Sequence, residues 1–204
     1  MLRYKWLLSL LLLLQLPAIQ RISAATPAQI YNACMKKVEG AKSLRAGFNL
    51  ASGGHSAAGT LLTKGTKFAV TMPGLGTWYD GKAMWSYSNA NRETTVWTPS
   101  KTELAESNPM LYISMASGFD AKAQAGGKGQ TVVLLTPKRR NAGVKSVKII
   151  INNATSLPEK LVITTGAQTS TITITSLSLN PPLADSEFTY PKKKYPKVPI
   201  TDLR

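Results

Sequence analysis

Hydrophobic and polar residues alternate along this chain with two different periods. Thr26 and Pro27 form a helix start, with an N-cap residue and a proline at the first helical position. Apolar residues then recur at helical spacing until Gly40, which predicts a helix over Pro27–Glu39. From residue 44 the period changes to two, which is typical of a half-buried strand. We therefore expect one short helix followed by strands.

Further strand-like runs follow at roughly 8 to 12 residue spacing, separated by Gly, Pro, Asn and Asp. Asp80-Gly81 is a hairpin signal, and Asn108-Pro109 opens a short, very apolar helix that ends before Gly118. The pattern predicts a mainly β protein of about eleven antiparallel strands with short helices, in one domain and without internal repeats. The expected strands cover residues 44–50, 59–64, 67–72, 77–79, 83–87, 94–98, 119–125, 131–136, 144–151, 159–164, 168–177 and 187–190.

The N-terminal segment has the pattern of a secretory signal peptide. Arg3 and Lys5 precede an apolar run over residues 6–16, which is shorter than the roughly 20 residues of a membrane span. Ser23-Ala24-Ala25 supplies small residues for cleavage near Ala25. We expect residues 1–25 to be removed and residues 26–204 to form one exported domain; the alternative is an uncleaved N-terminal anchor.

Composition narrows the choice of fold and function. With 43% hydrophobic and 17% charged residues, the 204-residue chain has enough apolar side chains for a core. The 25 Lys and Arg against 10 Asp and Glu give a charge of +15; losing Arg3, Lys5 and Arg21 with the signal peptide leaves 22 basic residues and +12. One Cys and one His exclude a Cys/His zinc site and an intrachain disulfide. Cys34 is expected to pack with Ile30 and Val38 on the helix.

Catalytic motifs are weak in this chain. His55 lies in a small polar stretch, residues 52–56, which is typical of a solvated loop histidine. No Gly-x-Ser-x-Gly elbow is present. The glycines around Lys128 lie between two predicted strands with no helix after them, which indicates a hairpin and not a phosphate loop. We expect no enzyme, no metal and no cofactor.

Two lysine- and arginine-rich clusters stand out, at residues 138–140 and 192–194. Solvated turn charges are one interpretation; contact with anionic lipid headgroups or with an acidic partner protein is the other. We expect no nucleic-acid partner for an exported chain.

Aromatic residues crowd the first hairpins, and methionines occupy the short apolar helix. In a closed, filled barrel these side chains are core. In an open sheet with a helix lying across it, they line a cavity for an apolar ligand, to which pliable methionine adapts. Strand alternation assigns one phase of each strand to that cavity. The candidate lining residues are Phe48, Phe68, Val70, Trp85, Met110, Ile113 and Met115.

An ordered set of segments resembles the periplasmic outer-membrane lipoprotein carrier family (LolA). The most specific is the hairpin in which Asp80-Gly81-Lys82 is followed by Trp85 and Tyr87. The others are residues 59–64, 67–68, 108–111, 135–138 and 188–191. The resemblance implies an incomplete β-barrel, a half-pipe with a helical lid over a cavity for the acyl chains of lipoproteins. It also implies a monomer that takes lipoproteins from an inner-membrane ABC transporter to an outer-membrane acceptor, without catalysis.

One position departs from that family. Where the typical carrier has an arginine that hydrogen-bonds to the lid, this chain has Gly65. We expect a loose lid, or Lys67 as a substitute donor. The departure leaves one alternative to a lipoprotein carrier, a divergent lipid-binding or envelope-sensing module of the same fold. A separate alternative, independent of Gly65, is an exported hydrolase whose triad is scattered along the chain.

Overall fold

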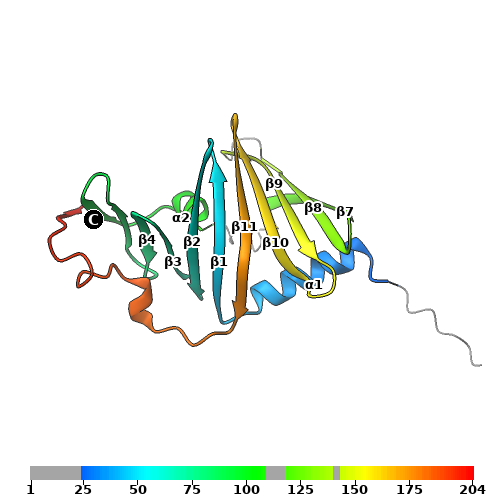
Figure 1. The fold of residues 1–204 in the computed structure, drawn as a ribbon, viewed down its shortest axis with the longest axis horizontal. Helices are drawn as coiled ribbons and strands as arrows, with labels where there is room; N and C mark the ends of the chain where they lie inside the picture. Colours follow the sequence, from blue (N-terminus) through cyan, green and yellow to red (C-terminus); the bar gives the residue numbers. More distant parts are fainter. Residues whose placement is uncertain (1–23, 109–117, 140–142) are drawn as a thin grey trace, which may run out of the picture.

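The computed structural model describes residues 24–108, 118–139 and 143–204, and these build one twisted sheet of twelve strands (Figure 1). The strand order is β12-β6-β5-β4-β3-β2-β1-β11-β10-β9-β8-β7. All pairs are antiparallel except β12 with β6, which is parallel. The two ends of the sheet do not pair, so the sheet stays open. This confirms the expected open, mainly β architecture.

Strands β1 to β11 agree closely with the predicted runs, apart from their ends, whereas β12 was not predicted. The strands are β1 (Ser43–Ser52), β2 (His55–Lys64), β3 (Lys67–Met72), β4 (Leu75–Tyr79), β5 (Met84–Ser88), β6 (Glu93–Trp97), β7 (Phe119–Ala125), β8 (Gln130–Pro137), β9 (Val144–Asn152), β10 (Leu157–Thr165), β11 (Gln168–Leu179) and β12 (Ile200–Asp202). The helices are α1 (Pro27–Glu39), α2 (Lys101–Ser107) and the 3-10 helix η2 (Asp185–Phe188). The expected apolar helix after Asn108 lies outside the described residues.

Helix α1 has the predicted bounds because both of its ends are capped. The Thr26 side chain accepts from the Gln29 amide, and the Gln29 side chain accepts from the Thr26 amide, which forms a capping box. The Gly40 amide donates to the Lys36 carbonyl at the other end. Ile30, Tyr31 and Cys34 are buried against the sheet, and α1 lies along β7, β8, β9 and β10.

The sheet buries side chains on both of its faces. On the inner face, which carries α1 and α2, alternate strand residues such as Leu61, Phe68 and Ile149 join the first core cluster. On the outer face, the residues between them, such as Leu62 and Ala69, join a second cluster with the C-terminal segment.

The C-terminal segment (residues 180–204) follows the outer face of the first six strands and ends beside β6, as the orange-to-red trace in Figure 1 shows. Its anchor is Phe188, which is 0% exposed. Residues 187–190 were expected to form a strand, which is wrong. The Ala184 amide donates to the Glu187 carboxylate and caps the turn of η2, and this turn directs Phe188 into the second cluster.

The buried thiol of Cys34 is expected to be inert in the folded protein. Burial raises its pKa to about 12, against a smaller lowering by Lys37, and the side chain is 0% exposed. Because the thiolate is the reactive form, alkylation by iodoacetamide at pH 8 should be at least about a hundredfold slower than in urea. Mass spectrometry of quenched samples measures this ratio; equal rates would show that α1 detaches readily.

Candidate functional site

A cavity of about 460 Å³ opens on the inner face of the sheet. Strands β1 and β3, which flank β2, supply one wall, and the paired strands β10 and β11 supply the other, each through two residues of the same phase. The end of α2 and the start of β9 border it. The lining residues are Phe48, Leu50, Val70, Met72, Ser107, Gly143, Val144, Ile163, Thr165, Ser170 and Ile172.

The chemistry of this lining suits an apolar ligand. Most of the lining side chains that the structure describes are aliphatic or aromatic; the polar ones among them carry only hydroxyls, and none of them is ionisable. The volume falls within the range of roughly 300 to 1,000 Å³ typical of small-molecule sites. Such a surface can hold a hydrocarbon chain.

Gly59 on β2 makes room for Phe48. The two residues face each other across the β1–β2 pair, and a Cβ at position 59 would lie 2.4 Å from Phe48 Cζ and 2.8 Å from Met72 Cγ. Both of those side chains line the cavity. The missing side chain therefore helps to set the position of two cavity walls.

The predicted site residues divide into four groups, of which Trp85 is the last. Phe48 and Val70 line the cavity. Phe68 lies on the same face but is 1% exposed; it packs in the first cluster, with its ring 5.6 Å from that of Tyr79. Met110, Ile113 and Met115 lie outside the described residues.

The prediction for Trp85 needs correction. Trp85 pairs with Trp78 across β4 and β5 and packs with it in the second cluster, on the outer face. Its neighbour Met84, 1% exposed, is the residue of β5 that faces the first cluster. Hydrophobicity alone did not show which residues of β5 face the cavity, because this strand is covered on both faces.

Several cavity residues were not predicted from the sequence. Leu50 and Met72 follow Phe48 and Val70 by two positions, so continued alternation along the same strands identifies them. Ile163 and Ile172 come from distant parts of the chain, and only the β1–β11 and β10–β11 pairings bring them to the site.

Gly65 is explained by the turn in which it lies. Only Gly65 and Thr66 connect β2 to β3, and Gly65 has a φ of 58°, in the left-handed region that favours glycine. An arginine there would carry a backbone penalty.

Among the described residues, Lys67 contacts the C-terminal segment, and its expected contact with the lid stays a prediction. Lys64 and Lys67 are cross-strand partners, and their ammonium groups donate to the two carboxylate oxygens of Asp185 at 2.8 and 2.9 Å. The hydrogen bond from Lys64, followed by that from Lys67, lowers the pKa of Asp185 to about 2. The lid itself falls outside the described residues, so the loose lid stays a prediction.

Neither a metal centre nor a membrane helix is found in the described ranges. No group of three or more His, Cys, Asp or Glu side chains there has the geometry to hold a metal ion. No helix in those ranges has both the length and the apolarity to cross a bilayer. His55, the first residue of β2, is exposed.

A family model described as outer membrane lipoprotein carrier protein LolA matches residues 26–167. The chain belongs to this family. The LolA match includes α1 and strands β1 to β10, and it stops before β11. In this member of the LolA family, β11 fills the place between β1 and β10, and the C-terminal segment covers the outer face.

Several solved structures align with this chain at low sequence identity. A conserved protein from Thermus thermophilus aligns over 86% of this chain and 98% of its own, with 12% identity and a TM-score of 0.56. A LolA superfamily protein from Nitrosomonas europaea aligns over 82% of this chain and 99% of its own, with 12% identity and a TM-score of 0.42. The lipoprotein LppX from Mycobacterium tuberculosis aligns over 76% of this chain and 95% of its own, with 14% identity and a TM-score of 0.43. No curated protein sequence matches the chain.

Proposed function

We propose that this protein is a periplasmic carrier that binds the acyl chains of lipoproteins in its inner cavity and ferries them toward the outer membrane. The observation that carries the proposal is the cavity on the inner face of a LolA-family sheet, whose described lining is mainly aliphatic and without ionisable side chains. Removing the hydrocarbon of an acyl chain from water is favourable by roughly 25 cal/mol per Å² of apolar surface buried. No catalytic step is needed for this function.

The proposed route has a donor and an acceptor. The family to which the chain belongs is named for an outer membrane lipoprotein carrier. By that relationship, an inner-membrane ABC transporter supplies the cargo, and an outer-membrane protein receives it. Residues 1–25 direct export and are removed near Ala25. The described cavity residues, with Phe48 and Val70 among them, hold the cargo; Met110, Ile113 and Met115 complete the proposed lining.

Leu50→Asp should abolish uptake of a fluorescent fatty-acid analogue. Leu50 lines the cavity and is only partly buried, so the carboxylate meets the ligand without entering the packed core. A charge facing a hydrocarbon chain is costly, and we expect affinity to fall by at least about tenfold. Fluorescence titration measures the affinity, and circular dichroism checks the fold.

The matched control is Ala51→Asp, which adds the same charge one residue later. Ala51 is exposed and points to the outer face, because neighbouring strand residues alternate. Uptake should be unchanged. If Leu50→Asp bound the analogue as well as Ala51→Asp does, the cavity would not be the ligand site.

A second function, an envelope-sensing or lipid-binding module of the same fold, uses the same cavity without handing the ligand on. Native mass spectrometry of protein purified from its own cell envelope identifies the retained acylated molecule. A transfer assay to acceptor membranes then separates the two functions: a carrier releases its cargo, and a sensor retains it.

A further inference from the structure

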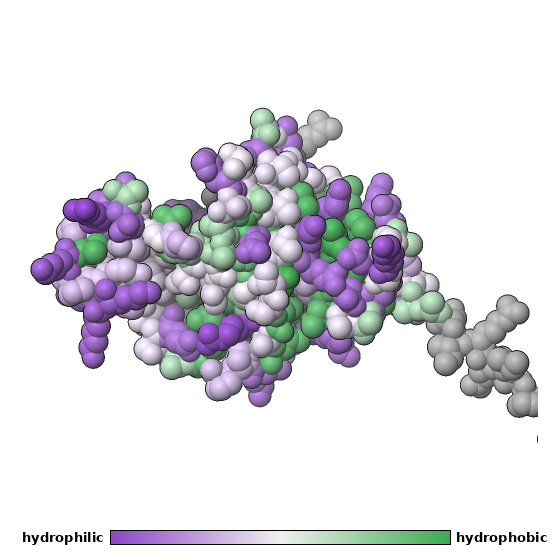
Figure 2. Space-filling model, in the orientation of Figure 1, coloured by the Kyte–Doolittle hydropathy of each residue, from purple (hydrophilic) through white to green (hydrophobic). Residues whose placement is uncertain are grey.

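One feature of the C-terminal segment is unrelated to the cavity: a lysine loop, defined here as residues 190–198. It carries four lysines, and no acidic residue lies between Glu187 and Asp202. All four lysines are exposed, and they take no part in the ion pairs found among the described residues. These lysines are Lys192, Lys193, Lys194 and Lys197. Figure 2 shows hydrophilic side chains gathered at the end of the molecule where this segment lies.

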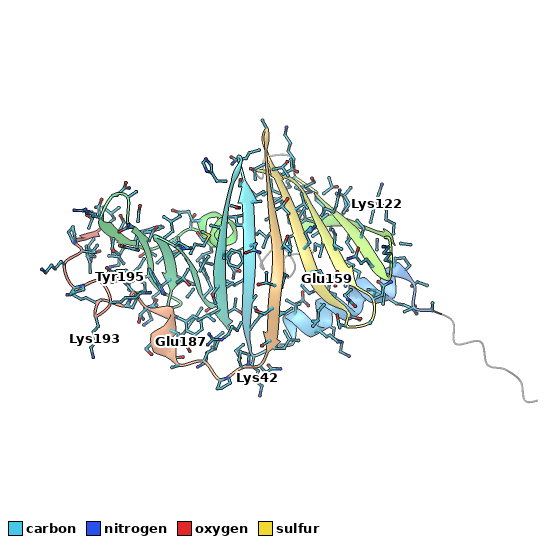
Figure 3. The ribbon with its side chains drawn as sticks, in the orientation of Figure 1. Lys42, Lys122, Glu159, Glu187, Lys193 and Tyr195 are labelled. Atoms are coloured by element: carbon cyan, nitrogen blue, oxygen red, sulfur yellow. The ribbon has the colours of Figure 1, made fainter. Side chains whose placement is uncertain are left out.

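The lysine loop has a fixed shape. The Lys194 amide donates to the Pro191 carbonyl at 2.8 Å, and the Tyr195 amide donates to the Lys192 carbonyl at 3.2 Å. Tyr195 stacks on Tyr87 of β5, with ring centroids 4.2 Å apart. In Figure 3, Tyr195 lies over the sheet and Lys193 extends away from it. The Lys194 ammonium lies over the Tyr195 ring, 5.5 Å from its centroid. The four lysines are thus carried by an ordered backbone, which lowers the entropy lost when they bind a surface.

Tyr190 ties the same loop to the outer face of the sheet. It is 8% exposed and packs edge-on against Trp78, with centroids 5.6 Å apart, and its ring lies 5.7 Å from that of Tyr195. Both tyrosines of the loop are thus occupied by the sheet. The groups of the loop that are exposed to a binding partner are mainly the lysine ammonium groups.

This composition suits a lipid surface better than a protein. Protein interfaces bury an apolar or aromatic centre, which the exposed side of this loop lacks. Lysine ammonium groups are compact, hydrated charges that bind phosphates without a required geometry, and the loop has no arginine fork. Beside Lys194, a hollow of about 300 Å³ lined by small residues such as Thr60 and Thr71 leaves room for a headgroup.

We propose that the lysine loop docks this protein on the surface of an anionic phospholipid bilayer. The loop lies on the outer face of the sheet, and the cavity lies on the inner face. Docking through the loop therefore leaves the cavity accessible. The proposal does not depend on what the cavity holds.

The test is co-sedimentation with vesicles of phosphatidylcholine mixed with an equal amount of phosphatidylglycerol. The mature protein should bind them and should not bind vesicles of phosphatidylcholine alone. Binding should weaken as salt rises, because exposed charges are screened over roughly 10 Å at 0.1 M. A triple variant, Lys192→Gln with Lys193→Gln and Lys194→Gln, should bind about a hundredfold more weakly, since each of the three lysines contributes about fivefold near the surface and the factors multiply.

A second triple variant controls for net charge. It removes the same charge from the outer face of the other half of the sheet, through Lys122→Gln on β7, Lys148→Gln on β9 and Lys160→Gln on β10. It should bind anionic vesicles nearly as well as the unaltered protein. Uptake of the fatty-acid analogue should be unchanged in both variants, which keeps this result separate from the cavity proposal.

Two outcomes would overturn the proposal. Equal loss of vesicle binding in the two triple variants would mean that net charge acts without a docking site. Failure to bind anionic vesicles, together with loop-dependent binding to polyglutamate, would assign the loop to an acidic protein partner.

Discussion

Phe188→Ala is expected to lower the free energy of unfolding by about 3 to 5 kcal/mol, the usual cost of removing a buried phenyl ring. Phe188 is 0% exposed and packs between the C-terminal segment and the outer face of the sheet, among Leu62, Ala69 and Trp78. The variant leaves a cavity that the strands cannot close. Urea unfolding followed by tryptophan fluorescence measures the loss, because Trp78 reports from this cluster.

Ser186→Ala is the matched control, on the same short helix. Ser186 is exposed, and a surface substitution of this kind normally changes stability by about 0.5 kcal/mol or less. If Phe188→Ala were as mild as Ser186→Ala, the C-terminal segment would unfold independently of the sheet and would not stabilise it.

Much of the sheet could be predicted because its order follows the chain. Strands β1 to β6 form consecutive hairpins, and so do β7 to β11, so local turn and alternation patterns determine most pairings. Helix α1 was predicted to the residue because the Thr26 cap and the Gly40 stop are both local signals. The same local signals explain why the centres of the strands were predicted accurately.

Long-range features were not visible in the sequence. The pairing of β1 with β11 joins segments from opposite ends of the described chain, and this pairing brings Leu50 opposite Ile172 in the cavity. The parallel strand β12 depends on where the C-terminal segment ends, after it has crossed the outer face. The alternation of hydrophobic and polar residues predicts neither of these two strand pairings.

The second cluster is also the reason that one site residue was misplaced. In an open sheet with one solvated face, aromatic residues mark the buried phase. Here the C-terminal segment covers the outer face of β4 and β5, and that face therefore carries Trp78 and Trp85. On the inner face, Tyr79 packs against the first cluster. Both faces of these strands therefore carry aromatic residues, and only the pairing of the strands shows on which face each residue lies.

Gly59→Val is expected to reduce uptake of the fatty-acid analogue sharply and to cost about 1 to 3 kcal/mol of stability, as overpacked cores do. The added Cβ would lie 2.4 Å from Phe48 Cζ and 2.8 Å from Met72 Cγ. These side chains must move, and the space open to them is the cavity that they line. Fluorescence titration and urea unfolding measure the two effects.

Ala58→Val is the control for the added bulk, since Ala58 is exposed, neighbours Gly59 and points to the outer face. It should leave uptake and stability close to those of the unaltered protein. Equal uptake by Gly59→Val and Ala58→Val would show that the side chains lining the cavity can move aside without reducing the space for the ligand.

The decisive variant combines Gly59→Val with Phe48→Ala. Each change alone disturbs the cavity, the first by crowding the phenyl ring and the second by removing it. Because the ring lies over Gly59, the valine occupies part of the space that the ring leaves, so the two costs should not add. We expect the double variant to be more stable than the sum of the single variants predicts, by about 1 kcal/mol or more, and to regain uptake relative to Gly59→Val. Simple additivity in both measurements would mean that Gly59 does not set the position of Phe48.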